Sequence, residues 1–429
     1  MNRLCFRLGS ISAAGAMIFA LGGLAQSTPT ALTWQQVKDR FEAVNPTLIA
    51  ARANIDEARA SEITAFLKPN PDLSITADGL QIAPNAGIWR PLSGIFYTAS
   101  VNYLVERANK RQLRLDNAKK STEISQSSYA DQRRTLLFTL RNAFVQVLQA
   151  KAVLGNANEN LKYWDNELDI NRRRYSAGDL ALLDLNRLEL ERAQFETDQQ
   201  NAGLNLNTSK ITIRQLLLMD REALERFDIA GEYTYSDSLK PLETFHAAAL
   251  ENRPDLKVAA QNVDLARLAH KLAIANGSVD PTFGLWYSFN GSFANPFANN
   301  TIGGSIDIPL RIHDRNQGEK ARTQIDIRAK ENLEAAAEAQ VFSDVDTAYV
   351  TIQNALALLG RYKTFYLPKA IDVRDRERDA FQHGGVTLLD YLDAEKTYRD
   401  NNLAYLNFIG SYMTAAAQMN QAVGQEVIP

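Results

Sequence analysis

The strongest constraint on the fold of this chain is an internal duplication. The stretch NPTLIAARANIDEARASEITA matches RPDLKVAAQNVDLARLAHKLA further on, with Pro46 and Pro254 among several identical pairs at one offset of 208 residues. The offset stays nearly constant toward the C-terminus, so one supersecondary unit occurs twice. We therefore expect a first repeat at 26–227, a linker at 228–241 and a second repeat at 242–429.

Each repeat shows the same order of elements. A helix with apolar residues at helical spacing comes first, at 47–67 and again at 254–275. Two runs of alternating apolar and polar residues follow it, as expected for strands with two different faces. In the sequence these runs lie at 72–82 and 94–105 in the first repeat, and at 282–290 and 305–312 in the second.

A very long helical segment comes next in both repeats. Residues 106–175 and 315–382 contain no proline except Pro368, and each would extend roughly 100 Å as a helix. Both segments run into a glycine turn, YSAGDLALLD or FQHGGVTLLD, after which a second long helix returns. The sequence thus predicts two long helical hairpins with related tips.

The four alternating runs match the pattern of outer-membrane strands, which carry apolar residues, aromatics included, along one face. An ordinary soluble sheet is the alternative, but helices of this length do not wrap a small soluble sheet. Four strands cannot close a membrane barrel, since closed barrels begin at about 8 strands. Two copies would supply about 8 strands and three about 12, and only the larger barrel begins to open a lumen. We expect a homotrimer.

The order and spacing of these elements, with the tip sequences YSAGDLALLDLNRLE and FQHGGVTLLDYLDAE, resemble the TolC-like outer-membrane efflux proteins over nearly all of the mature chain. The stretch IPLRIHDRNQGEKAR is similar to the cobalt–zinc–cadmium (CzcC-like) heavy-metal efflux branch. The resemblance implies a mainly α fold with β, in which the helical hairpins form a periplasmic α-barrel. The four strands per chain would contribute to a trimeric 12-strand outer-membrane β-barrel.

The same resemblance implies a function and partners. The chain would be the outer-membrane exit duct of a tripartite efflux system, with most of its residues in the periplasm. It would receive substrate, heavy-metal cations in this branch, from an inner-membrane pump of the resistance-nodulation-division type through a periplasmic adaptor protein. Two alternatives remain open: the outer-membrane conduit of a type I protein secretion system, and a soluble periplasmic coiled-coil scaffold or adaptor.

Two groups of residues are candidates for functional roles in such a duct, one at the periplasmic entrance and one in adaptor docking. Asp390 and Asp393 are three positions apart on one helix, so a threefold arrangement would bring six carboxylates to a periplasmic entrance. A solvated helix face is the competing interpretation, and the acidic residues Asp72, Asp78 and Asp307 of the strand region are a second possible source of ion selectivity. The expected adaptor-docking tips contain glycines for close approach and leucines as exposed apolar knobs: Gly178, Leu182, Gly384, Gly385 and Leu388.

The remaining features mainly exclude functions. Arg3, Arg7 and the apolar run after them predict a signal peptide at 1–25, and Cys5 within it is the single cysteine of the chain. The net charge of −3 gives no argument for nucleic acid. The four histidines show no metal-ligand spacing and no catalytic constellation is visible, so we expect neither an enzyme nor a cofactor or bound metal.

Overall fold

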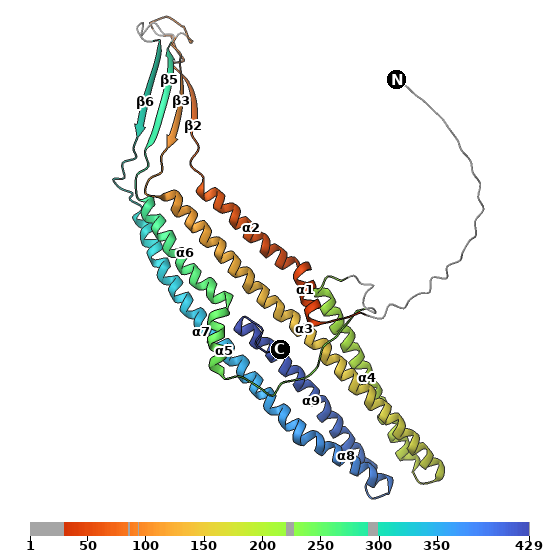
Figure 1. Ribbon diagram of the computed structural model, residues 1–429. Helices are drawn as coiled ribbons and strands as arrows, with labels where there is room; N and C mark the ends of the chain where they lie inside the picture. The colour runs from red at the N-terminus through yellow and green to blue at the C-terminus, as the bar shows by residue number, and fades with distance from the viewer. Residues whose placement is uncertain (1–29, 85, 93, 220–226, 291–298, 429) are drawn as a thin grey trace, which may run out of the picture.

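The structure, a computed structural model, describes residues 30–428 except for 85, 93, 220–226 and 291–298. The predicted signal peptide, Cys5 included, lies outside the described residues. The described part is long and narrow, with a small sheet at one end and two helical hairpin tips at the other (Figure 1). Between these ends the helices run side by side along the molecule.

The two repeats contain the same series of main elements. In the first repeat they are β1 (Thr30–Leu32), α1 (Trp34–Val44), α2 (Pro46–Phe66), β2 (Asp72–Asp78), β3 (Phe96–Leu104), α3 (Lys110–Ala177) and α4 (Leu182–Leu216). The linker and the second repeat contain β4 (Phe227–Ile229), α5 (Leu242–Asn252), α6 (Pro254–Asn276), β5 (Thr282–Asn290), β6 (Asn300–Asp307), α7 (Gln317–Arg361), the π-helix η2 (Tyr362–Tyr366), α8 (Leu367–Gln382) and α9 (Leu388–Val423).

The helices begin where their sequences favour a helix start. Pro46 and Pro254 are the first residues of α2 and α6, a position at which proline loses no hydrogen bond. The Asn45 side chain caps α2 by accepting from the Leu48 amide at 3.1 Å. α3 has 68 residues, which corresponds to about 100 Å, as the absence of proline predicts.

The second long segment is interrupted where the sequence places its one proline. α7 passes through η2 into α8 without leaving a helical path, and Pro368 lies in the first turn of α8. Proline has no amide hydrogen to donate to the preceding turn. The wider π turn just before it is a usual accommodation of such a break in the α-helical ladder.

The four longer strands form one antiparallel sheet with the order β2-β3-β5-β6, so β2 and β6 are its edges. The first three strands confirm the predicted runs. The fourth prediction was wrong in position, because β6 ends at Asp307 and Ile308, Leu310 and Ile312 lie beyond it. Pro309 cannot donate to a strand ladder, and Gly303 and Gly304 occupy the strand instead.

A second, smaller sheet was not predicted. β1 pairs in parallel with β4, and Leu32 lies opposite Ile229. This pair ties the start of the described chain to the segment that joins the repeats. It contributes to a buried cluster around Phe41, Phe144 and Leu217, about halfway along the molecule.

Candidate functional site: the sheet and the hairpin tips

The sheet has one apolar face. The strand register places Leu73 beside Val101, Val101 beside Leu285, and Tyr287 beside Ile302, so their side chains emerge on the same side. The larger residues of this face are between 43% and 73% exposed: Leu73, Ile75, Tyr97, Val101, Phe283, Leu285, Tyr287, Phe289, Ile302 and Ile306. A contiguous apolar surface of this kind needs an apolar environment.

The opposite face is mainly polar, although it also carries Phe96, Leu104 and Trp286, and it is better covered on three of the four strands. On β3, β5 and β6 its serines, threonines and asparagine are half-buried, whereas the apolar residues that alternate with them are mostly exposed. The Trp286 ring lies over Gly303, where a Cβ atom would come within 2.4 Å of it. The polar face is therefore the more enclosed side of the sheet, and we call it the inner face. Asp72 and Asp307 lie on this inner face near the helical end, Asp78 lies at the far end of β2, and the face carries no lysine or arginine among the described strand residues.

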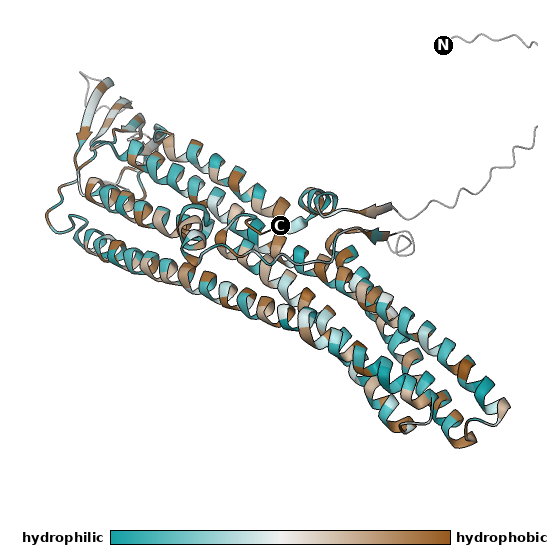
Figure 2. Cartoon of the chain, turned by 60° about the horizontal axis from the view of Figure 1, so that its bottom comes forward, coloured by the Kyte–Doolittle hydropathy of each residue, from teal (hydrophilic) through white to brown (hydrophobic). Residues whose placement is uncertain are grey.

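This arrangement matches a segment of membrane barrel wall, apolar outside and polar inside. None of the helices in the described part of the chain combines the length and apolar character needed to cross a bilayer. Apolar and polar residues are instead interleaved along all the long helices (Figure 2).

At the other end, glycines terminate the first helix of each hairpin as predicted. Gly178 follows α3 with φ +87°, and Gly384 lies just beyond α8 with φ +73°. The Asp179 amide donates to the Arg174 carbonyl, and the Gly385 amide donates to the Ala380 carbonyl, which closes both helix ends. Residues with a side chain rarely adopt this left-handed backbone conformation, so the turns require glycine at these two positions. Gly385 has an ordinary φ.

The leucines of the two tips differ in exposure. Leu182 is 54% exposed, but its repeat counterpart Leu388 is only 4% exposed, so the expectation that both are exposed knobs is wrong for Leu388. Leu388 belongs to a buried cluster with Trp164 and Phe381, because α9 begins facing the interior of its hairpin. Leu389, at 72% exposure, is the apolar residue that this tip presents to solvent.

The two acidic candidates lie on the first turns of α9, and both are exposed. Asp390 is part of a capping box: the Thr387 amide and hydroxyl donate to its carboxylate at 3.0 and 2.6 Å, and the Thr387 hydroxyl accepts from the Asp390 amide. These hydrogen bonds from Thr387 lower the pKa of Asp390. Asp390 therefore has a local structural role, whereas Asp393 makes no hydrogen bond or ion pair among the described interactions.

Behind the tips, the two hairpins are joined by aromatic stacking. The Trp164 ring of α3 lies 4.9 Å from Phe195 of α4 and 6.1 Å from Tyr391 of α9, measured between centroids, and Tyr391 lies 5.7 Å from Phe381. Nearer the tip, Arg174 donates to the Gln382 carbonyl at 3.0 Å and so connects the end of α3 to the end of α8.

Next to this stack are charged residues that sequence reasoning missed. Glu395 of α9 is 2% exposed and Glu167 of α3 is 6% exposed, and burial is the main cause that raises the pKa of both carboxyl groups, to about 7 for Glu395. The nearest cation is Arg374, whose Nε lies 4.0 Å from Glu395 Oε2. For Glu395, its position one turn after Tyr391 on α9 was the only available signal, and for Glu167 a glutamate in a polar helix gives no warning of burial.

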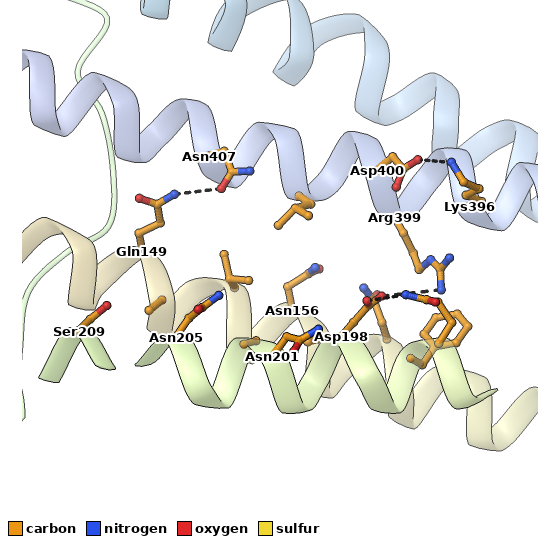
Figure 3. A pocket seen from close by; sticks show the side chains of 18 of the residues that line it. Gln149, Asn156, Asp198, Asn201, Asn205, Ser209, Lys396, Arg399, Asp400 and Asn407 are labelled. Carbon is orange, nitrogen blue, oxygen red and sulfur yellow. Dashed lines mark hydrogen bonds and ion pairs between the residues drawn. The ribbon is translucent and has the colours of Figure 1, made fainter. Parts of the chain in front are cut away.

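Further along the hairpins, a groove of about 860 Å³ lies between α3, α4 and α9 (Figure 3). Amide side chains make up much of its lining. The Gln149 side chain donates to Asn407 at 2.9 Å, and Asn156, another lining residue, accepts from Asn402. Arg399 approaches Glu191 at 3.3 Å across it. No group of three or more metal-ligating side chains occurs among the residues that the structure describes.

Comparisons with known proteins agree with this geometry. The family model described as outer membrane efflux protein matches residues 39–217 and 247–425, one match in each repeat. The cobalt-zinc-cadmium resistance protein CzcC of Cupriavidus metallidurans is 24% identical over 89% of this chain and 87% of its own length. The outer membrane protein TolC of Vibrio cholerae is also 24% identical, over 94% of this chain and 93% of its own length.

Among solved structures, the outer membrane protein VceC of Vibrio cholerae superposes with a TM-score of 0.74 at 15% identity, covering 91% of this chain and 96% of that one. This likeness confirms the predicted fold class, mainly α with long helical hairpins and four strands per chain in one sheet.

Proposed function

Because this chain belongs to the outer membrane efflux protein family, we propose that it is the exit duct of a tripartite efflux system and passes heavy-metal cations. The coarser part of this statement follows from the family: the protein is an outer-membrane efflux channel rather than an enzyme, and its helices extend into the periplasm. The family match over both repeats removes the alternative of a soluble scaffold.

The observation that carries the proposal is the two-faced sheet. Its edge strands, β2 and β6, have unpaired backbone groups, which lipid does not tolerate. Three copies, each joining its β2 edge to the β6 edge of the next, would form a closed wall of about 12 strands. The apolar face would then meet lipid and the polar face would line a lumen.

Cation transport is supported by the charge of that inner face. Its charged residues in the described strands are the carboxylates Asp72, Asp78 and Asp307, with no fixed cation to oppose them. Rings of carboxylates favour cations in a pore. The similarity to CzcC, whose name records resistance to cobalt, zinc and cadmium, points to the same class of substrate.

The partners are proposed from the tips. Leu182 and Leu389 are exposed apolar residues at the ends of the two hairpins, where a periplasmic adaptor would bind. The adaptor would connect the duct to an inner-membrane pump of the resistance-nodulation-division type. Gly178, Gly384 and Gly385 would allow its backbone to come close to the turns, since Gly178 and Gly384 have open space around them.

Removal of the protein from its host tests the proposal. Cells without it should accumulate cobalt, zinc or cadmium and become more sensitive to these ions, and the intact chain should restore export. Secretion of polypeptides by the same cells is measured in parallel, to distinguish metal efflux from protein secretion. A secretion defect with unchanged metal content would favour the type I conduit and contradict the metal proposal.

A further inference from the structure

The buried carboxyl of Glu395 lies where four helices meet, just behind the tips. Tyr391 and Glu395 are one turn apart on α9, and Tyr391 is in the aromatic stack that joins the two hairpins. Glu395 is 2% exposed in a single chain, so its burial does not depend on any second copy. Any movement of α9 away from α3 and α8 must change the solvation of this carboxyl.

One oxygen of the Glu395 carboxyl lacks a hydrogen-bond partner among the described residues. This atom, Oε2, is buried, and Arg399 Nη1 is likewise buried with no hydrogen-bond partner in the described part of the chain. Arg374, the nearest cation, directs its guanidinium to Asp375 at 2.9 and 3.1 Å. A buried carboxylate without hydrogen bonds is unfavourable, whereas a neutral carboxylic acid is tolerated.

Charged and titratable groups face Glu395 from each neighbouring helix. They are Tyr163 and Glu167 of α3; Arg374, Asp375 and Arg378 of α8; Tyr391 and Arg399 of α9 itself; and Glu191 and Asp198 of α4, which pair with Arg399. The arginines favour the ionised form of Glu395 and Glu167 opposes it, but burial has the largest effect. Together they raise the pKa of Glu395 to about 7.

We propose that Glu395 is a proton-binding site that holds the two hairpins together: the neutral acid stabilises the packing of α9 on α3 and α8, and loss of the proton releases it. When α9 separates, the carboxyl is hydrated and its pKa returns toward the ordinary 4.5. At any pH between 4.5 and about 7, the packed state therefore holds a proton that the separated state has lost. Packing therefore weakens as pH rises from 4.5 to about 7, and it changes no further above 7.

The consequence for transport rests on the proposed function. If the tips form the periplasmic entrance, separation of the hairpins widens it, so the duct would open more readily at neutral than at acidic pH. The pH-dependent packing itself does not require that the protein be a channel.

The test is amide hydrogen exchange of the full chain in detergent micelles from pH 5 to 8.5, corrected for the intrinsic pH dependence of exchange. Protection of residues 388–400 and 160–171 should fall by up to about tenfold per pH unit below 7 and level off above it. Glu395→Gln, which imitates the neutral acid, should give protection that is high and much less dependent on pH than in the unaltered chain, since only the buried carboxyl of Glu167 still titrates there. Glu167→Gln should move the start of the plateau to lower pH.

Asp400→Asn is the matched control, because Asp400 is on the same helix, 61% exposed and paired with Lys396. It should behave as the unaltered chain does. A pH-independent profile in the unaltered chain, or an unchanged pH dependence in Glu395→Gln, would overturn the proposal. Conductance in planar bilayers is recorded separately: a protein that conducts no ions at any pH contradicts the proposed channel, while the exchange profile still decides the role of Glu395.

Discussion

At the scale of single residues, the structure separates the two acidic candidates of the α9 tip. Asp390 accepts two hydrogen bonds from Thr387 and helps to start the helix, whereas Asp393, one turn later, is exposed. An effect of changing Asp390 can therefore come from the helix start as well as from lost charge. Asp393 is the cleaner probe of the entrance.

We predict that Asp393→Ala lowers the cation preference of the open channel by about two- to fivefold and weakens block by divalent cations from the tip side. The expected cause is the loss of one carboxylate per chain at the proposed entrance. Planar-bilayer reversal potentials measure it, with Asp400→Ala as a matched exposed control further from the tip. Selectivity and block that do not change would assign Asp393 to a solvated helix face.

Asp390→Ala should differ from Asp390→Asn. Both remove the charge, but the asparagine keeps a side-chain oxygen for the Thr387 amide and hydroxyl. We predict faster amide exchange over the first turn of α9 in the alanine variant than in the asparagine variant, with similar ion selectivity. In the unaltered chain the pKa of Asp390 is lowered, so its capping contribution persists at neutral pH and disappears only as pH falls through that lowered value.

At the scale of elements, the duplication predicted both hairpins, the order of helices and strands along the chain, and the glycine turns. It could not predict the difference between Leu182 and Leu388, because related tip motifs say nothing of how each hairpin rotates against its neighbour. The position of β6 was missed for a related reason. Gly303 has a low strand propensity by itself, and only the Trp286 ring across the sheet explains why it is tolerated there. The burial of Glu395 likewise depends on four helices that are distant in sequence.

The glycine turns give a prediction for the hairpins. Gly178→Val and Gly384→Val should each cost about 1–2 kcal/mol locally, because both positions have positive φ and a β-branched residue is strained there. We expect loss of adaptor binding and export with the assembly intact, measured by co-purification and metal efflux. Gly155→Ala is the control, since Gly155 lies within α3 away from the turns, has no positive φ and has nothing within 4 Å of its new Cβ. Normal export by both valine variants would contradict a docking role for the turns.

At the scale of the whole molecule, we expect the inner face of the sheet to set the ion preference of the outer-membrane section of the duct. Asp72 and Asp307 lie at the helical end of the strands, on the edge strands β2 and β6, which would be neighbours between adjacent copies. We predict that Asp72→Asn with Asp307→Asn lowers cation preference independently of Asp393→Ala, so that the two effects multiply. Asp78→Asn, at the far end of β2, tests whether position along the wall matters. If a variant that combines Asp72→Asn, Asp307→Asn and Asp393→Ala is as cation-selective as Asp393→Ala alone, the strand carboxylates do not contribute and all of the selectivity arises at the tips.

The last prediction concerns assembly: the detergent-solubilised protein is a trimer. One chain presents two unlike open edges, with β2 and α4 on one side and β6 and α7 on the other (Figure 1). Unlike edges close into a ring when each copy is rotated relative to the last, and three copies give about 12 strands around a lumen. Light scattering with mass correction for detergent measures the number of chains. Cysteines placed on β2 and β6 should cross-link only between chains, since both positions are sheet edges within one chain. A monomer or dimer of uniform mass that still conducts ions would contradict this assembly.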